Sequence, residues 1–287
     1  MTAPLLEADH VSKVFAMGGL FGRNSFKAVN DVSFTLTDGR PEIFTIVGES
    51  GSGKTTLSRL ILNISRPSQG TIRFRGQDVA SARGRKARLA FMSEVQPIFQ
   101  NPFEAFNPLK RVDRYLFMSA QRFASARTRE DAESRSNQAL QKVGLSLAEV
   151  RGRFPHELSG GQLQRTAIAR ALISSPALLV ADEPVSMVDA SLRMSIVNLF
   201  KTLRDHLGVS IIYITHDLAT AYYISDRVMI MRRGSVVEEG DARSVLDNPQ
   251  HAYSIQLKNA VLSPEPADAS RLSMGPESDV ALMADTT

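Results

Sequence analysis

The sequence contains no cysteine, which excludes disulfides, thiolate metal sites and cysteine nucleophiles. Long apolar runs are also missing, since stretches such as Ala177–Val180 and Val209–Ile214 end after a few residues. A helix that crosses a bilayer needs about 20 consecutive apolar residues, so we expect no transmembrane segment. The first residues, MTAPLLEADH, lack a basic start followed by an apolar stretch, and we therefore expect no secretory signal. Together these absences predict a protein of the cytoplasm.

The chain has no large excess of one charge, because 34 Lys and Arg face 30 Asp and Glu and leave a net charge of +4. Basic residues do gather at Arg83, Arg85, Lys86 and Arg88. A nucleic-acid surface would place aromatic residues among them, and this stretch has none. We therefore interpret it as a solvated loop and expect no nucleic-acid partner.

The order of apolar patterns predicts an α/β protein. With 287 residues the chain is long enough for one elaborate domain or two smaller ones. Alternation in Leu5–Val14 and Ala28–Leu36 predicts two antiparallel strands joined by a turn. Later, predicted helices alternate with the apolar strands Leu178–Ala181, Val209–Thr215 and Val228–Met231, which is typical of a parallel sheet covered by helices.

The segment from Asn101 to about Arg153 has a different character. Amphipathic patterns predict helices over Val112–Phe123 and Glu130–Val143, and we interpret this part as a helical insertion. The final residues, 263–287, are rich in Pro, Ser, Ala and Asp and have little apolar surface to bury, so we expect a mobile tail.

A glycine-rich loop, Gly48-Glu-Ser-Gly-Ser-Gly-Lys-Thr-Thr56, joins the predicted strand Ile43–Val47 to a predicted helix from Lys54. It matches G-x-x-x-x-G-K-[ST], in which glycines let backbone N–H groups form a concave ring around a triphosphate. The positive end of the helix adds to this attraction. We expect Lys54 to reach the β- and γ-phosphates and the Thr55 hydroxyl to bind Mg²⁺. An ordinary Gly-Ser loop is the alternative, but the strand before and the helix after favour a phosphate site.

Two acidic residues, Asp182 and Glu183, end the predicted strand in Ala177-Leu-Leu-Val-Ala-Asp-Glu-Pro184. Ligands of α/β proteins sit at the carboxyl edge of the sheet. We expect Asp182 to hold Mg²⁺ through water and Glu183 to orient and polarise the attacking water. Alone the pattern is also compatible with an acid that caps a turn.

A second glycine pair opens a helix in Leu158-Ser-Gly-Gly-Gln162. Ser159 and Gln162 fit a capping box, so a well-made helix start is one interpretation. Two consecutive glycines are costly in a first helical turn, however, and they favour a second phosphate-binding surface.

In this order the three motifs resemble the ATP-binding subunits of ATP-binding-cassette (ABC) transporters, over about Leu5 to Leu262. The resemblance implies a RecA-like P-loop core with a mainly parallel sheet, an antiparallel β subdomain and a helical insertion subdomain. It places one ATPase domain at 1–262, with the helical subdomain at about 101–157, before the tail at 263–287. It also implies that the Leu158–Gln162 signature completes the site of a partner subunit, so that two subunits, identical or different, hold two ATP molecules head to tail.

Further roles follow from matching the family pattern. Phe15 corresponds to the aromatic residue that stacks on adenine, and Gln100 to the glutamine that touches Mg²⁺ and water. Asp189 corresponds to the loop that communicates across the dimer, where Met187 occupies a position that is often smaller. His216 corresponds to the histidine that contacts the γ-phosphate.

The predicted sites fall into three groups. Glu183, His216 and Lys54 are the expected catalytic residues, and Thr55, Gln100 and Asp182 are the expected metal site. The expected nucleotide-binding residues are Phe15, Gly48, Glu49, Ser50, Gly51, Ser52, Gly53, Lys54, Thr55, Thr56, Gln100, Ser159, Gly160, Gly161, Gln162 and Asp189.

Further segments indicate the kind of transporter. Asn101–Pro108, Phe154–Gly161 and Asp247–Ser254 resemble the oligopeptide and dipeptide importer branch, which also contains importers of nickel and oligosaccharides. His216–Tyr223 resembles the sugar-importing members somewhat more. The expected partners are two transmembrane permease subunits and an extracytoplasmic substrate-binding protein, with this chain on the cytoplasmic face of the inner membrane. A non-transport ABC ATPase of DNA repair or of ribosomes is the alternative, although those proteins usually carry two cassettes or long insertions.

Overall fold

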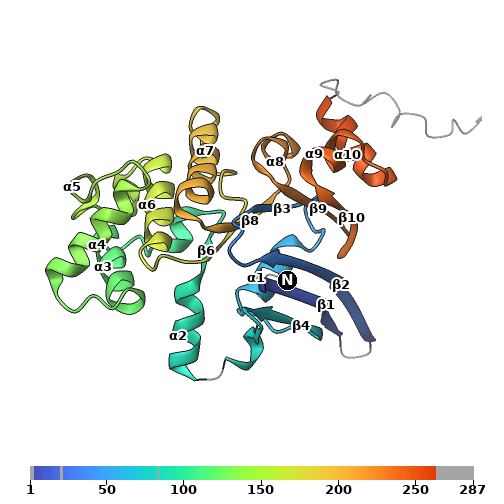
Figure 1. The fold of residues 1–287 in the computed structure, drawn as a ribbon, viewed down its shortest axis with the longest axis horizontal. Coiled ribbons are helices and arrows are strands. Elements are labelled where there is room, and N and C mark those ends of the chain that lie inside the picture. Colours follow the sequence, from blue (N-terminus) through green and yellow to red (C-terminus); the bar gives the residue numbers. More distant parts are fainter. Residues whose placement is uncertain (1–2, 20–21, 83, 263–287) are drawn as a thin grey trace, which may run out of the picture.

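A six-stranded sheet forms the centre of the protein (Figure 1). The computed structural model describes residues 3–19, 22–82 and 84–262. Five strands of this sheet run parallel, and β10 pairs antiparallel with β9 at one edge. The strand order is β10-β9-β3-β8-β7-β6, with bounds Ser235–Asp241, Arg227–Arg232, Ile43–Val47, Ser210–Thr215, Leu178–Asp182 and Val95–Ile98. The predicted parallel sheet is confirmed.

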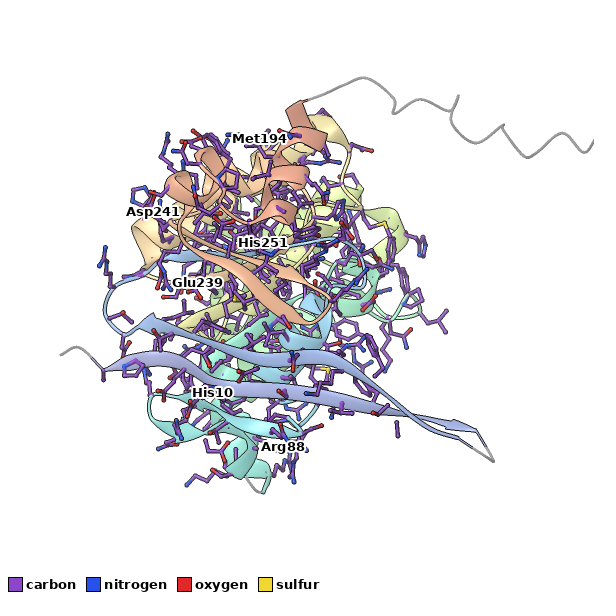
Figure 2. All side chains as sticks on the ribbon, turned by 90° about the vertical axis from the view of Figure 1, so that its right-hand side faces the viewer. His10, Arg88, Met194, Glu239, Asp241 and His251 are labelled. Carbon is purple, nitrogen blue, oxygen red and sulfur yellow. The ribbon has the colours of Figure 1, made fainter. Side chains whose placement is uncertain are left out.

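A second, antiparallel sheet has the order β2-β1-β4-β5. Its strands are Gly22–Thr37, Pro4–Gly19, Gln69–Phe74 and Gln77–Asp78. Figure 2 shows β1 and β2 as two long strands lying side by side. Apolar side chains of this sheet pack with α1 (Lys54–Ile61) and one face of the central sheet in a shared cluster. The rings of Phe34 and Phe44, one from each sheet, stack with centroids 5.0 Å apart.

Five helices lie on the other side of the central sheet, and the last two of them contact its strands. These are α3 (Val112–Phe123), α4 (Arg129–Gln141), α5 (Leu147–Val150), α6 (Gly160–Leu172) and α7 (Ala190–Leu207). The first three lie at the end of the molecule away from β1 and β2 (Figure 1). Leu116 of α3, Leu140 of α4 and Leu163 of α6 are fully buried in one cluster that reaches the central sheet. This shared cluster ties the helical segment to α6, while its limits as a subdomain, 101–157, stay a prediction.

The C-terminal part adds three helices beside β9 and β10: α8 (Leu218–Ile224), α9 (Ala242–Asp247) and α10 (Ala252–Leu262). A third apolar cluster joins them to Val47, the last residue of β3. The tail at 263–287, which we expected to be mobile, lies outside the described residues. None of the helices in the described part of the chain has the length and apolarity that crossing a membrane would require.

One local prediction is wrong: the basic stretch is a helix rather than a solvated loop. Arg85, Lys86 and Arg88 lie on α2 (Arg85–Glu94), while Arg83 falls outside the described residues. Helix α2 buries no residue completely, and Phe91 supplies an edge-to-face contact with Phe74 at 6.0 Å. Lysine and arginine are good helix formers, so a basic surface was no argument against a helix. Strands β6 and β10 and helices α9 and α10 were not predicted from the sequence.

Candidate active site

The glycine-rich loop lies between β3 and α1, as predicted, at the carboxyl end of a central strand. Gly53 caps α1 with a φ of 104°, a conformation that favours glycine. A Cβ atom there would also lie 2.2 Å from the carbonyl oxygen of Ala28, so the loop packs directly on β2. The loop geometry therefore depends on this glycine for both conformation and space.

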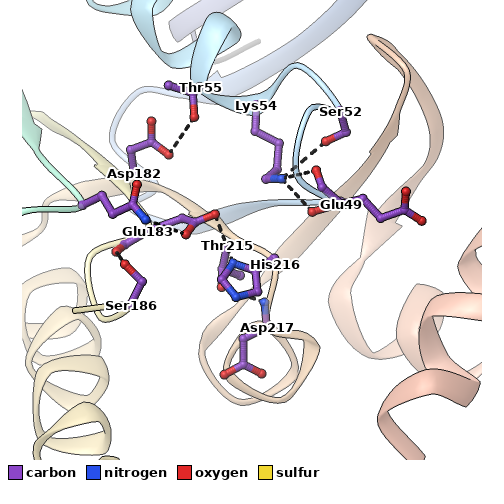
Figure 3. A network of polar contacts seen from close by, with 12 residues as sticks. Glu49, Ser52, Lys54, Thr55, Asp182, Glu183, Ser186, Thr215, His216 and Asp217 are labelled. Atoms are coloured by element: carbon purple, nitrogen blue, oxygen red, sulfur yellow. Dashed lines mark hydrogen bonds and ion pairs between the residues drawn. The ribbon is translucent and has the colours of Figure 1, made fainter. Parts of the chain in front are cut away.

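Lys54 is buried at the start of α1, and its side chain folds back over the loop (Figure 3). Its ammonium group donates to the carbonyl oxygens of Gly48 at 2.6 Å and Glu49 at 2.7 Å. Burial lowers the pKa of Lys54, and the nearby carboxylates of Glu183 and Asp182 oppose this effect. The lysine is thus a desolvated cation held by weak neutral acceptors, ready to exchange them for an anionic ligand.

Asp182 ends β7 and faces α1. Its carboxylate accepts hydrogen bonds from the hydroxyls of Thr55 at 3.5 Å and Ser58 at 3.2 Å. Burial raises the pKa of Asp182, and these two hydroxyls counteract part of the rise. Ser58 was not among the predicted site residues. It lies three positions after Thr55, on the same face of α1, and this spacing could have identified it.

Glu183 follows in a left-handed backbone conformation with a φ of 45°, which is rare for a residue with a side chain. Its N–H donates to the carbonyl oxygen of Ile214 at 2.9 Å, so the strained residue remains tied to β8. Its own carbonyl accepts from the Ser186 hydroxyl at 3.0 Å. Strained residues persist where the surrounding structure fixes them, and they concentrate at functional sites.

Two further predicted residues meet the Glu183 carboxylate, and Figure 3 labels one of them, His216. The Gln100 amide donates to one oxygen at 3.2 Å, and Nδ1 of His216 lies 3.1 Å from the other. Gln100 follows β6, Glu183 follows β7 and His216 follows β8. Because these strands are parallel neighbours, their carboxyl ends bring the three side chains together.

Oxygen ligands suitable for Mg²⁺ are also present: Thr55 contacts Asp182, and Gln100 contacts the neighbouring Glu183. Thr55, Asp182 and Gln100 offer a hydroxyl, a carboxylate and an amide oxygen, the hard donors that Mg²⁺ prefers. Within the described ranges, no group of three or more His, Cys, Asp or Glu side chains is placed so that it could hold a metal ion by itself. One carboxylate with neutral donors suits a Mg²⁺ ion that takes its remaining ligands from phosphate and water, so the residues present are compatible with this ion.

The predicted signature residues lie elsewhere in the fold. Ser159 and Gln162 form the capping box of α6, with bonds of 3.2 and 3.1 Å between side chains and backbone. Among described residues, no hydrogen bond or ion pair joins the signature to the glycine-rich loop. Figure 1 shows the two helix starts in different parts of the molecule. The capping interpretation therefore describes the chain by itself, and the second phosphate-binding surface stays a prediction.

Two other predicted positions are exposed. Phe15 of β1 is 45% exposed, and the ammonium group of Lys13 lies 5.3 Å from its ring centroid. Asp189 precedes α7 without a side-chain cap, next to Met187, which is 62% exposed. Neither Phe15 nor Asp189 joins the group around Glu183 within the described chain, so their predicted roles depend on ligand or partner contacts.

A glycine-rich phosphate loop on a parallel sheet covered by helices defines the class of P-loop nucleotide hydrolases. Residues 29–186 match the family described as ABC transporter. The chain is 38% identical over 266 residues to the oligopeptide transport ATP-binding protein OppF of Bacillus subtilis (strain 168), covering 93% of this chain and 85% of the relative. It is 37% identical over 245 residues to the oligopeptide transport ATP-binding protein AmiF of Streptococcus pneumoniae, covering 85% of this chain and 79% of the relative.

Among solved structures, the chain is similar to the dimeric ATP-binding cassette MJ0796, determined in a post-hydrolysis state with ADP and Pi. The TM-score is 0.72 at 26% identity, covering 83% of this chain and 99% of the other. The chain therefore belongs to the ABC transporter family. It binds and hydrolyses ATP, and the expected fold class is confirmed.

Proposed function

We propose that this protein is the ATP-hydrolysing subunit of an importer of oligopeptides, bound peripherally at the cytoplasmic face of the inner membrane. The observation that carries the proposal is the similarity to oligopeptide transport ATP-binding proteins over nearly the whole chain, 93% in one case. A relative from a second genus, AmiF, is also an oligopeptide transport ATP-binding protein. The cargo assignment therefore rests on similarity, while the chemistry rests on the site.

Hydrolysis at this site depends on positioning and on electrostatic stabilisation. Lys54 leaves the carbonyls of Gly48 and Glu49 and neutralises the β- and γ-phosphates. Glu183 accepts a hydrogen bond from the attacking water and polarises it, with Gln100 and His216 holding the carboxylate in place. His216 also contacts the γ-phosphate as charge develops there.

Thr55, Gln100 and Asp182 would hold Mg²⁺, with Asp182 reaching the ion through water. The ion supplies neutralisation of phosphate charge when bound. Ser58 keeps the Asp182 carboxylate directed toward α1 through its 3.2 Å hydrogen bond. The hydroxyls on α1 thus orient the one carboxylate that faces the ion.

Ser159–Gln162 complete the nucleotide site of a second ABC ATPase subunit, and Asp189 lies in the loop that communicates between the two. A Cβ atom at Gly160 would meet no atom within 4 Å, so this glycine is not needed for packing within the chain. An absent side chain facing open space leaves the N-terminal amides of α6 free to approach a ligand. The similar cassette with ADP and Pi is itself dimeric. Phe15 stacks on the adenine of the ATP held by its own loop.

The remaining partners are two transmembrane permease subunits and an extracytoplasmic substrate-binding protein. The ATPase pair closes around nucleotide and reopens after hydrolysis. This movement is transmitted to the permeases and changes their conformation. The second ATPase subunit is the same chain or a different one.

The function can be tested by reconstituting the transporter in proteoliposomes. The binding protein is placed on the side of the membrane opposite to the ATPase subunits. We expect oligopeptides to stimulate phosphate release severalfold above the basal rate and oligosaccharides to leave it unchanged. Stimulation by oligosaccharides alone would overturn the cargo assignment. ATP hydrolysis with no dependence on permeases or binding protein would overturn the transport role.

A further inference from the structure

Tyr253 of the C-terminal helix α10 contacts the glycine-rich loop although it lies 204 residues away in sequence. The residue is 1% exposed and is one of the largest fully buried side chains of the described chain. Its ring belongs to the apolar cluster that contains Val47, directly before the loop. The ring therefore lies under the point where β3 turns into the loop.

The Tyr253 hydroxyl accepts a hydrogen bond from the N–H of Glu49 at 3.0 Å. The carbonyl oxygen of the same residue accepts from the Lys54 ammonium at 2.7 Å. One residue of the loop thus connects the C-terminal helix to the lysine on which phosphate binding depends. Because the Glu49 N–H is directed to Tyr253, it is not among the loop donors that can turn toward phosphate.

The position of Tyr253 is itself fixed from several sides. The Glu238 carboxylate accepts from the backbone N–H groups of Gln250 at 2.9 Å and His251 at 3.2 Å, which anchors the start of α10 to β10. The guanidinium of Arg232 lies 4.7 Å from the Tyr253 ring centroid. Burial raises the pKa of Tyr253, so the hydroxyl stays neutral at physiological pH.

A second contact holds the loop from the same side. The N–H of Gly234, in the turn between β9 and β10, donates to the carbonyl oxygen of Ser52 at 2.9 Å. The β9–β10 turn and α10 therefore bind the loop at two separate peptides. Phenylalanine would fill the apolar space around Tyr253 equally well, and a buried hydroxyl is costly unless it is hydrogen-bonded. The hydroxyl is thus explained by its bond to the loop.

We propose that Tyr253 is a positioning residue for ATP binding, through which the C-terminal helix fixes the first peptide of the phosphate loop. This inference rests on the proposed use of that loop for ATP. The loop then reaches its nucleotide-binding shape before ATP arrives, which lowers the ordering cost of binding. Loss of the hydroxyl should weaken ATP binding and leave the chemical step nearly intact, because Tyr253 touches neither Glu183 nor His216.

Substitution of Tyr253 by Phe in the full chain removes the hydroxyl and keeps the ring. We expect the Kd for ATP, measured by titration calorimetry with Mg²⁺, to rise about three- to tenfold, the size that corresponds to one hydrogen bond. In the assembled transporter, KM for ATP should rise by a similar factor while kcat falls less than about twofold. Amide exchange in Gly48–Thr55 of the nucleotide-free variant should become faster.

Tyr222→Phe is the matched control, because the exposed Tyr222 hydroxyl lies 3.4 Å from Asp247 and does not touch the loop. It should leave Kd, KM and loop exchange at wild-type values. A Tyr253→Phe variant with wild-type Kd and loop exchange, even one with a lowered Tm, would show a merely structural hydroxyl and overturn the inference. Equal losses in the two variants would do the same. Lys54→Met, measured in parallel, tests the loop itself: wild-type ATP affinity there would refute the proposed function whatever Tyr253 does.

Discussion

His216 and Glu183 face each other across the ends of two adjacent parallel strands, with Nδ1 of the histidine 3.1 Å from a carboxylate oxygen of the glutamate. The left-handed backbone of Glu183 turns its side chain into this position directly after Asp182. Glu183, the candidate residue for polarising water, thus lies beside His216, the candidate contact of the γ-phosphate.

Glu183→Gln should retain ATP binding and lower turnover of the assembled transporter at least about a hundredfold, because a neutral amide cannot polarise the attacking water. His216→Ala should also lower turnover. The double variant should be little slower than Glu183→Gln alone, since both residues serve one step. Phosphate release and ATP binding by all three variants test this, and losses that multiply would show that the two residues act independently.

Gly160→Asp should leave the fold and the ATP affinity of the isolated chain unchanged, because a side chain at this position meets open space. In the assembled complex the added carboxylate would face the phosphates held by the partner. Turnover should fall at least about a hundredfold, comparable to the loss of an oxyanion donor. Turnover assays on the complex and calorimetry on the chain provide the comparison. Gly161 is the less informative site, since a Cβ atom there would lie 2.8 Å from the Leu192 side chain. Normal turnover in Gly160→Asp would contradict the shared-site proposal.

Lys54→Met should abolish stabilisation by ATP without lowering the Tm of the nucleotide-free chain. Burial lowers the pKa of Lys54, so the folded state releases this proton more readily than the unfolded state does. The buried lysine therefore lowers the stability of the folded chain at neutral pH. This destabilisation becomes smaller as pH rises from the lowered pKa toward the ordinary value near 10.5. With ATP at about 100 times its Kd, the free energy of unfolding of the wild-type protein should rise by about 2.7 kcal/mol, and that of the variant should not rise. Thermal unfolding with and without ATP measures both effects. A lower Tm for the nucleotide-free variant would indicate that the carbonyl contacts outweigh the cost of burial.

Asp182→Asn should stabilise the nucleotide-free chain at neutral pH. Burial raises the pKa of Asp182 above its ordinary value of 3.8, so the folded state holds this proton more tightly than the unfolded state. Stability from this group is present below that ordinary value and is lost as pH rises through the raised pKa. The advantage of the variant should accordingly shrink as pH falls toward the ordinary value.

Metal dependence distinguishes the roles of Asp182 from those of Lys54. Stabilisation of Asp182→Asn by ATP should be the same with Mg²⁺ as with EDTA, whereas wild type should gain more with Mg²⁺. Ser58→Ala provides a matched variant that leaves the carboxylate but removes its 3.2 Å hydrogen bond. It should keep a reduced response to Mg²⁺. An undiminished Mg²⁺ response in Asp182→Asn would remove Asp182 from the metal site.

Predicted strands and helices agree with the structure where they carry a strong local signal. Ile43–Val47 is an apolar run that ends at the glycine-rich loop, and Val112–Phe123 has a clear helical period. The prediction of a loop for the basic stretch was wrong for the opposite reason. Helix α2 has no fully buried residue, so its apolar pattern is faint and its Lys and Arg content suggested a loop. Weakly buried helices leave little trace in hydrophobic periodicity.

The sequence alone identified the motifs: the loop around Lys54, the acids after β7 and the histidine after β8. It could do so because phosphate binding demands particular residue types at short, fixed spacings. Which of these residues meet depends on how the strands pair in the folded chain. Parallel pairing brings Gln100, Glu183 and His216 together, keeps the signature away from its own loop, and places Tyr253 on Glu49. Such contacts link residues far apart in the chain, and their energies depend on burial and distance, which no local pattern of residues encodes.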